Sequence, residues 1–395
     1  MSELRFASAL SVLPETPAAE VEAVAALEQS LGGATPELLV LFITHHHGGA
    51  LDGLGRRLMQ ATGAKRLLGC TGETVIGGSR EVEEGPALAL WALAGDGVWI
   101  EPFRVGARAD EEGEVQFSGL PPAEFAEEGT LLMLGDPFSF PMGQYLEQLN
   151  EHYPGRPVIG GMASGGRGPG QNLLFQDGET LAWGAVGLWL GGSVEVVPVV
   201  SQGCRPIHEP YVITKIQDHV IRKLGGKTAA HVLQKAFQSL ESRDAALLQR
   251  APFLGVAVDA TKSTFQRGDF LVRGIMGIEK REGGIAIADN SLRAGQTVQF
   301  MVRDAQSASE DLDQLLAAQA SEGEVGVLLF SCNGRGTRMF PVADHDASRV
   351  QARYGREVPA AGFFAMGEIG PVGGRNFLHG FTASLAVMRP RALPS

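Results

Sequence analysis

Polar side chains that could do chemistry gather behind an apolar stretch near the C-terminus. The string Ser331-Cys332-Asn333-Gly334-Arg335-Gly336 follows residues 325–330, which have the composition of a buried strand. A nearby cation and turn amides can stabilise a cysteine as its thiolate, which is the nucleophilic form. Cys332 is therefore a candidate nucleophile in acyl or thiol transfer, although it is equally compatible with a small apolar side chain at a strand end. A nucleophile would also need a base, and His345 or His379 could serve only if the fold brings one of them close.

A second polar cluster follows in segment 367–380, where glycine and proline surround Glu368, Arg375, Asn376 and His379. Glycine lets the backbone approach a ligand closely, so this composition favours a binding pocket over a solvated loop. Arginine presents a planar fork to a carboxylate, and a glutamate can accept a hydrogen bond from an ammonium group. Together with Cys332, Asn333 and Arg335, this cluster predicts a site for an amino acid or a related metabolite.

Two more candidate ligand-binding residues lie in the N-terminal half. Glu73 is embedded in the glycine-rich turn 72–78, and His45 opens the triplet 45–47 after an apolar run. Adjacent histidines point in different directions, and no cysteine or carboxylate at ligand spacing completes a metal site. Residues 225–228 end like a phosphate-binding loop, but Ile221 occupies the position of its first glycine. We therefore predict neither a metal nor a cofactor.

These clusters belong to a unit that occurs three times along the chain. Each copy reads as an apolar strand, a polar turn, a helix, a second strand and a glycine-rich loop. The copies begin at residues 38–43, 130–134 and 325–330, and their loops are 72–78, 160–166 and 367–374. The pattern predicts that the loops gather at one rim of the sheets, where ligands bind in layered folds.

The mixture of strands and helices with short links predicts an α/β (mixed α+β) fold with two lobes. Two sheets packed face to face with helices outside them would make a layered sandwich. Residues 211–224 carry apolar side chains at helical spacing and precede Gly225-Gly226, which predicts a connecting helix. We place the boundary between the lobes near residue 210.

Charge and composition exclude several classes of protein. The chain has 395 residues and a net charge of −12, which argues against a nucleic acid or an anionic membrane surface as the main partner. No apolar run approaches the roughly 20 residues that cross a bilayer. Three scattered cysteines give no disulfide framework and fit a reducing compartment. We expect a cytoplasmic protein without membrane insertion.

Several of these strings resemble a known family. Segment 362–382, together with Ser331-Cys332-Asn333-Gly334-Arg335-Gly336, is similar to the C-terminal domain of the FIST family, and Gly69-Cys70-Thr71-Gly72-Glu73 and Gly160-Gly161 resemble its N-terminal domain. The resemblance covers residues 37–380. It implies a FIST N-terminal-like domain over 1–210, a C-terminal-like domain over 211–395, and a sensory module for small ligands. Here Gly72-Glu73 follows Cys70-Thr71 directly, where the family has a longer turn.

The leading interpretation is a small-molecule sensor in signal transduction, and not an enzyme, because the sequence contains no complete catalytic constellation. Such a sensor would act through a separate signalling protein. The alternative is an enzyme that uses Cys332 as its nucleophile.

Overall fold

The structure is a computed structural model that describes residues 3–262, 264–265, 268–289, 291–319, 323–355 and 357–392. The chain packs into two units. The first unit comprises residues 1–200, 312–378 and 382–395, and the second comprises 201–311 with 379–381. No helix among the described residues is both long enough and apolar enough to cross a membrane. The predicted mixed α/β class is confirmed.

The first unit is built from three copies of one motif, as the sequence repeats predict. In each copy two parallel strands flank a helix, because a parallel connection needs a crossover. The three copies are β2 (Leu38–Thr44), α2 (Leu54–Thr62) and β3 (Arg66–Gly72); β10 (Thr130–Gly135), α3 (Met142–His152) and β11 (Val158–Met162); and β24 (Gly326–Cys332), α7 (His345–Tyr354) and β25 (Ala360–Ala365).

Each motif gives its following hairpin to the sheet of another motif. The three hairpins are β4 (Val75–Gly77) with β5 (Arg80–Val82), β12 (Leu174–Gln176) with β13 (Glu179–Leu181), and β26 (Glu368–Val372) with β27 (Arg375–His379). The first pairs with β25, the second with β3 and the third with β11. The three six-stranded sheets are therefore interlocked, and each contains strands from two motifs.

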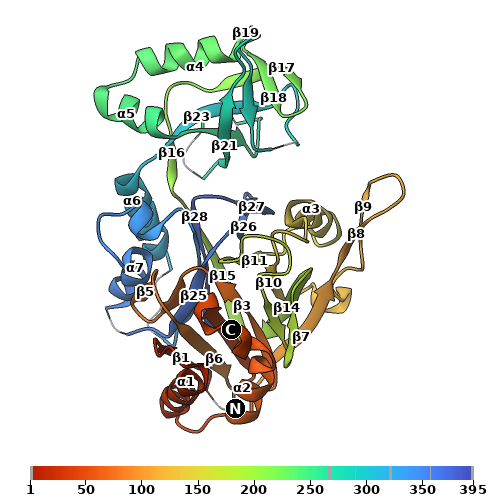
Figure 1. Ribbon diagram of the computed structural model, residues 1–395, viewed down its shortest axis with the longest axis vertical. Helices are drawn as coiled ribbons and strands as arrows, with labels where there is room; N and C mark the ends of the chain where they lie inside the picture. The colour runs from red at the N-terminus through yellow and green to blue at the C-terminus, as the bar shows by residue number, and fades with distance from the viewer. Residues whose placement is uncertain are drawn as a thin grey trace. The chain divides into compact units, whose positions relative to one another are not determined.

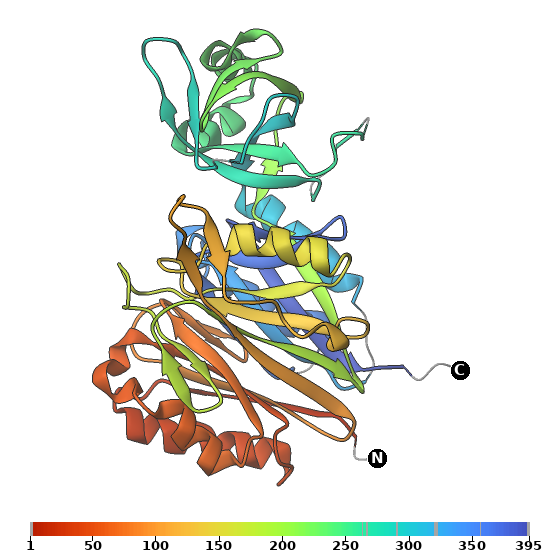
Figure 2. The same cartoon turned by 90° about the vertical axis from the view of Figure 1, so that its right-hand side faces the viewer.

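Two antiparallel strands complete each sheet and give all three the same strand order. They are β1 (Arg5–Ser11) and β6 (Leu88–Ala94), β7 (Val98–Val105) and β14 (Ala185–Gly192), and β15 (Val194–Gln202) and β28 (Thr382–Pro390). One apolar core takes side chains from all three sheets, while helices cover their outer faces (Figures 1 and 2). The sequence predicts helices outside packed sheets, and the structure has this arrangement with three sheets around one core.

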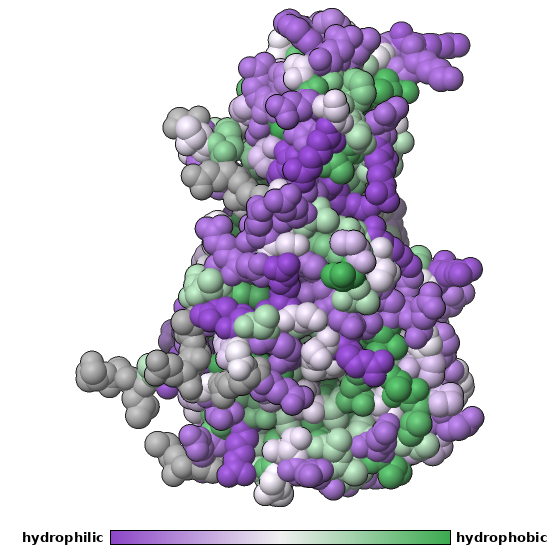
Figure 3. Space-filling model, turned by 90° about the vertical axis from the view of Figure 1, so that its left-hand side faces the viewer, coloured by the Kyte–Doolittle hydropathy of each residue, from purple (hydrophilic) through white to green (hydrophobic). Residues whose placement is uncertain are grey.

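Strand β2 shows why its sequence is apolar throughout. Leu38, Val40 and Phe42 point into the central core, whereas the alternate residues pack against α1 (Thr16–Leu31) and α2. A strand that is buried on both faces needs apolar residues at every position. The outer faces of the helices meet solvent, and the face in Figure 3 is mostly hydrophilic with separate hydrophobic patches.

The second unit is an insertion between β15, the edge strand of the third sheet, and the strand β24. Its described residues form an eight-stranded sheet, the helices α4 (Ala229–Gln238) and α5 (Ser242–Arg250), and the start of α6 (Ala305–Ala317). The strands are β16 (Cys204–Pro206), β17 (Tyr211–Gln217), β18 (Val220–Leu224), β19 (Lys227–Thr228), β20 (Pro252–Ala257), β21 (Phe270–Ile278), β22 (Ile285–Ile287) and β23 (Thr297–Arg303).

The predicted helix over 211–224 is wrong, because this segment forms the hairpin β17–β18. Asp218 occupies its turn with φ of 51°, a left-handed conformation that aspartate tolerates. The segment is rich in β-branched residues, which favour strands. A bulge in β17 shifts the register. Such a shift disturbs strict alternation, so the apolar spacing imitates a helix.

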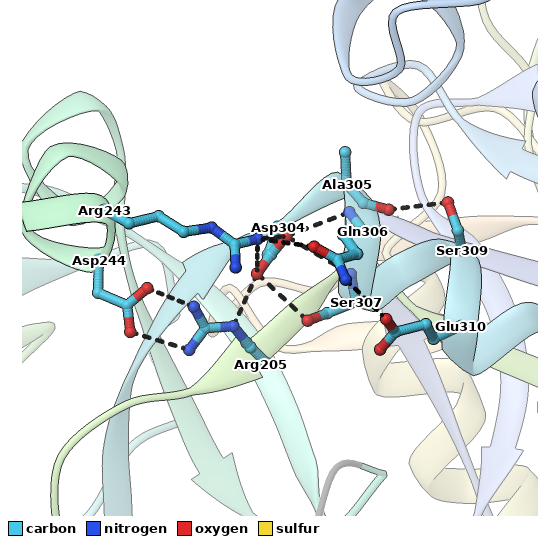
Figure 4. A network of polar contacts seen from close by, with 9 residues as sticks. All are labelled: Arg205, Arg243, Asp244, Asp304, Ala305, Gln306, Ser307, Ser309 and Glu310. Atoms are coloured by element: carbon cyan, nitrogen blue, oxygen red, sulfur yellow. Dashed lines mark hydrogen bonds and ion pairs between the residues drawn. The ribbon is translucent and has the colours of Figure 1, made fainter. Parts of the chain in front are cut away.

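A polar network holds the start of α6 (Ala305–Ala317) in the second unit (Figure 4). Asp304 precedes this helix and accepts the N–H of Gln306 at 3.1 Å, as an N-cap residue does. Its carboxylate also accepts from Arg205 at 2.8 Å and from Arg243 at 3.0 Å. Burial opposes its ionisation, but the hydrogen bonds from Arg205 and Ser307 and the charges of Arg205 and Arg243 together outweigh burial and lower the pKa of Asp304. One carboxylate therefore joins α5, β16 and α6.

Candidate functional site

The candidate site lies where β24 and β25 end side by side. These strands are parallel, with Cys332 opposite Ala365, so the residues that follow both strands meet at one edge of the sheet. The N–H of Asn333 donates to the carbonyl of Ala365 at 3.0 Å and fixes the two loops together. We call Cys332, Asn333, Arg335 and Glu368 the Cys332 site.

Arg335 is fully buried and forms a bidentate ion pair with Asp346. Its Nε and Nη2 atoms each lie 2.7 Å from one carboxylate oxygen, and its guanidinium lies 5.1 Å from the centre of the Phe340 ring. This loop conformation requires glycine at position 336. The φ of Gly336 is 55°, and an added Cβ would lie 2.6 Å from the Phe364 ring. The arginine is therefore anchored from two sides.

Asp346 lies in the first turn of α7, and its carboxylate is within hydrogen-bond distance of two further side chains. Ser331 donates to its Oδ2 at 2.7 Å, and Nδ1 of His345 lies 2.8 Å from its Oδ1. Burial disfavours the charged carboxylate, but Arg335 and His345 outweigh burial and hold the pKa of Asp346 well below its usual range. The aspartate is thus ionised at neutral pH.

Glu81 reaches the same helix from β5 of the first motif. Its Oε1 accepts the N–H groups of Asp346 and Ala347 at 2.8 and 2.9 Å, so it occupies the position of a helix cap. Burial and the negative charge of Asp346 raise the pKa of Glu81 to about 8. Sequence reasoning named His345 only as a possible base for Cys332 and missed Glu81 and Asp346, although an acidic residue in the first turn of a predicted helix was a usable signal.

Glu368 begins β26 and is also fully buried. Its Oε2 accepts the N–H of Thr382 at 3.1 Å. Burial raises its pKa to about 8, against the opposing effects of Thr382, the Cys332 thiol and the Arg335 charge. At neutral pH this carboxyl is therefore mostly protonated and can donate a hydrogen bond.

Cys332 is the only partly exposed cysteine, whereas Cys70 and Cys204 are buried. Its sulfur accepts the N–H of Gly334 at 3.4 Å. Charges of Arg335 and Arg338 act on it, and the Glu368 carboxyl lies beside it. Burial raises the pKa of the Cys70 thiol well above its usual value. Cys332 thus combines partial exposure with two nearby arginine charges.

Three buried polar atoms of the Cys332 site have no hydrogen-bond partner among the described residues. They are Oδ1 of Asn333, Nη1 of Arg335 and Oε1 of Glu368. Buried polar groups in folded proteins are nearly always paired, so three such atoms in neighbouring residues call for an explanation. A bound ligand or ordered water would supply the missing partners.

The first and second motifs also reach the site. Ser164 of the second motif donates to the carbonyl of Phe364 and accepts the N–H of Glu73 at 2.8 Å. The ring of His45 lies 2.9 Å from the carbonyl of Ser164. Glu73 forms an ion pair with Arg338, which donates to the Asn333 carbonyl at 2.8 Å. Glu73 is thus joined to the site through Arg338, and His45 through Ser164.

The other three predicted site residues lie elsewhere. Arg375 is exposed at the turn end of the β26–β27 hairpin, about 13 Å along the strand from Glu368 at about 3.3 Å per residue. Asn376 is buried and bonded to Asn150 and to the carbonyl of Arg156, so it ties β27 to α3. His379 is buried and belongs to the second unit. Within the described ranges, no three His, Cys, Asp or Glu residues are grouped to hold a metal ion.

Comparisons with known proteins identify the family. The FIST N domain matches residues 37–227, and the FIST C domain matches residues 229–371. The predicted boundary near residue 210 stays a prediction. An uncharacterized protein of Mycobacterium tuberculosis strain H37Rv is 40% identical over 390 residues, which are 97% of this chain and 99% of the relative. An uncharacterized protein of Mycobacterium bovis is 38% identical over 97% of this chain and 98% of its own.

A search of solved structures finds the cyanuric acid hydrolase of A. caulinodans, with a TM-score of 0.33 and 10% identity over 100% of both chains. FIST domains are associated with sensing and signal transduction. The two family models together span nearly all of the sequence, and the mycobacterial relatives match along almost their whole length. This chain therefore belongs to the FIST family.

Proposed function

We propose that the chain is a sensor that binds an amino acid or a related small metabolite at the Cys332 site. The observation that carries this proposal is the set of three buried, unpartnered polar atoms on Asn333, Arg335 and Glu368. Leaving such groups unpaired costs about 1–3 kcal/mol each, and a ligand that pairs them recovers this free energy on binding.

The protonation states of the polar side chains determine which of them can donate a hydrogen bond to the ligand and which can accept one. Nη1 of Arg335 and the protonated Glu368 are donors, and together they suit the two oxygens of a ligand carboxylate. Oδ1 of Asn333 is an acceptor and suits an ammonium group. The sequence suggested that Glu368 would accept from the ammonium, but a carboxyl with a pKa of about 8 is the better donor. The bound state would then be read by a separate signalling protein.

The first test is a thermal-shift screen of the full chain with the common L-amino acids. We expect at least one to raise the melting temperature, because a ligand that binds only the native state stabilises it. Asn333→Ala removes an acceptor that has no hydrogen-bond partner among the described residues, so it should weaken binding about tenfold, or about 1.4 kcal/mol, while the fold stays intact.

The matched control is Arg375→Ala, which changes an exposed residue outside the Cys332 site and should leave the affinity unchanged. Failure of every amino acid to shift the melting temperature would contradict the choice of ligand. An equal loss of affinity in both variants would instead place the ligand outside the Cys332 site.

A second candidate function is thiol chemistry at Cys332, favoured by its partial exposure beside Arg335, Arg338 and an acidic proton donor. Iodoacetamide should label Cys332 at least about tenfold faster than Cys70 or Cys204, because the other two are buried. Peptide mass spectrometry after timed labelling measures the three rates. Equally slow labelling of all three would exclude a nucleophilic role and leave the sensor proposal standing.

A further inference from the structure

The three sheets of the first unit differ most in the segment that follows the edge strand β1, β7 or β15 and precedes the motif. After β1 the chain forms α1, and after β15 it forms the whole second unit. After β7 it instead forms a small two-stranded hairpin, β8 (Ala107–Ala109) and β9 (Val115–Phe117), followed by the turn η2 (Ala123–Phe125). Figure 1 shows this hairpin at the side of the first unit. The second motif therefore carries an addition that the sheet itself does not need.

The hairpin encloses a cavity of about 790 Å³ together with β7, β13 and the loop that leads into β14. This volume lies within the range of about 300–1,000 Å³ that holds small-molecule ligands. Its apolar wall consists of Val105, Ala107, Phe117, Leu181, Trp183 and Ala185. None of these residues belongs to the Cys332 site.

Two aromatic rings, those of Trp183 and Phe117, belong to this wall. Trp183 is 60% exposed, yet its ring lies so close to Gly106 that an added Cβ would be only 3.1 Å away. Phe117 packs on Tyr145 and Phe140, with ring centres 4.9 and 5.5 Å apart. The cavity therefore offers aromatic faces that are partly open to solvent, where a planar ligand can stack.

The charges in the wall are all positive, although the chain as a whole carries −12. Arg104 and Arg108 line the cavity, and no aspartate or glutamate does. Arg104 is already bonded to Gln176 and Glu179. The Arg108 side chain is exposed and has no hydrogen bond or ion pair with another described residue, so its guanidinium is available to an anion. The acidic residues at the hairpin tip, Asp110 among them, lie outside this wall.

We propose that this cavity is a second ligand site, which binds an aromatic anion. The ring stacks on Trp183 and Phe117, and its carboxylate or sulfonate bonds Arg108. The proposal is independent of the Cys332 site, which contains different residues and sits on the third motif.

The test uses two fluorescent probes with the full chain: the anion 8-anilino-1-naphthalenesulfonate and the neutral N-phenyl-1-naphthylamine. We expect saturable binding of one anion per chain. Arg108→Gln should weaken the anion about tenfold and leave the neutral probe unchanged, whereas Trp183→Ala should weaken both. Arg375→Gln, a distant exposed arginine, and Asn333→Ala, in the Cys332 site, should change neither.

Each contrary result overturns the proposal. Unchanged anion binding in Arg108→Gln or Trp183→Ala would mean that the probe binds elsewhere, and so would a loss in Asn333→Ala. An equal loss of both probes in Arg108→Gln would mean that the arginine holds the hairpin and does not bind the anion. Far-ultraviolet circular dichroism of each variant confirms that the fold is retained before binding is compared.

Discussion

Replacing Asp346 by alanine is expected to destabilise the first unit by about 3–5 kcal/mol, because the change leaves the fully buried Arg335 without its partner. Urea denaturation followed by tryptophan fluorescence measures this loss selectively. All four tryptophans, Trp91, Trp99, Trp183 and Trp189, belong to the first unit, so the signal does not report on unfolding of the second.

The chain offers a matched control on the same helix. Arg349 of α7 pairs with Asp313 of α6, but these side chains are 36% and 49% exposed, against 0% and 1% for Arg335 and Asp346. Asp313→Ala should therefore cost no more than about 1 kcal/mol. Comparable losses in the two variants would contradict the burial of Arg335. A double variant, Arg335→Met with Asp346→Leu, should recover part of the stability because no buried charge is left unpaired.

This expectation changes how Arg335 can serve a ligand. The sequence suggested that its whole fork binds a carboxylate, but two of its three nitrogens already face Asp346. Only Nη1 remains. Arg335 is therefore unsuitable for testing ligand binding by substitution, and Asn333 is the better position because its side-chain oxygen has no partner within the part of the chain that the structure describes.

The parts of the site that could be predicted are contiguous in sequence. Cys332, Asn333 and Arg335 follow one buried strand and Glu368 follows its parallel neighbour, so strand patterns alone suggest that they meet. Glu81 and Asp346 come from a different motif and from a helix start, and no local pattern connects them to Arg335. Arg375 and Asn376 share a segment with Glu368, but the hairpin carries them to its far end.

The fold shows the same division between local and long-range information. Apolar runs and glycine loops identify the three strand–helix–strand motifs, because each depends on local periodicity. The exchange of hairpins between sheets depends on pairings such as Gly362 with Ile76, nearly 300 residues apart, which no short pattern encodes. The hairpin 211–224 was mistaken for a helix because a bulge disturbs its alternation.

The second prediction with a large expected effect is that the stability of the first unit depends on pH. Burial raises the pKa values of Glu81 and Glu368 from 4.5 to about 8, so the folded protein holds two protons that the unfolded chain releases at lower pH. The stability associated with these protons is fully present below about pH 4.5 and is lost as pH rises to about 8. Each carboxyl contributes up to about 1.4 kcal/mol per pH unit within this window.

The other groups whose pKa values are shifted change the free energy of unfolding mainly outside the upper part of this pH range. Burial lowers the pKa of His47 from 6.5, which makes stability rise with pH only below about 6.5. Burial raises the pKa of Cys70 well above 9.0, which affects stability only in more alkaline solution. Between about pH 7 and pH 8 the pH dependence of the first unit should therefore come mainly from Glu81 and Glu368.

We expect the free energy of unfolding of the first unit, measured by tryptophan fluorescence in urea, to fall as pH rises from about 7 to about 8. Glu81→Gln and Glu368→Gln keep an acceptor for the helix and for Thr382 but cannot ionise, so each should make the fall shallower. The double variant should be nearly independent of pH in this range and more stable than the natural protein at about pH 8, while the exposed control Glu111→Gln should behave like the natural protein. A double variant that keeps the full pH dependence would show that both carboxyls are already ionised in the folded protein, and the donor role proposed for Glu368 toward a ligand would fail with it.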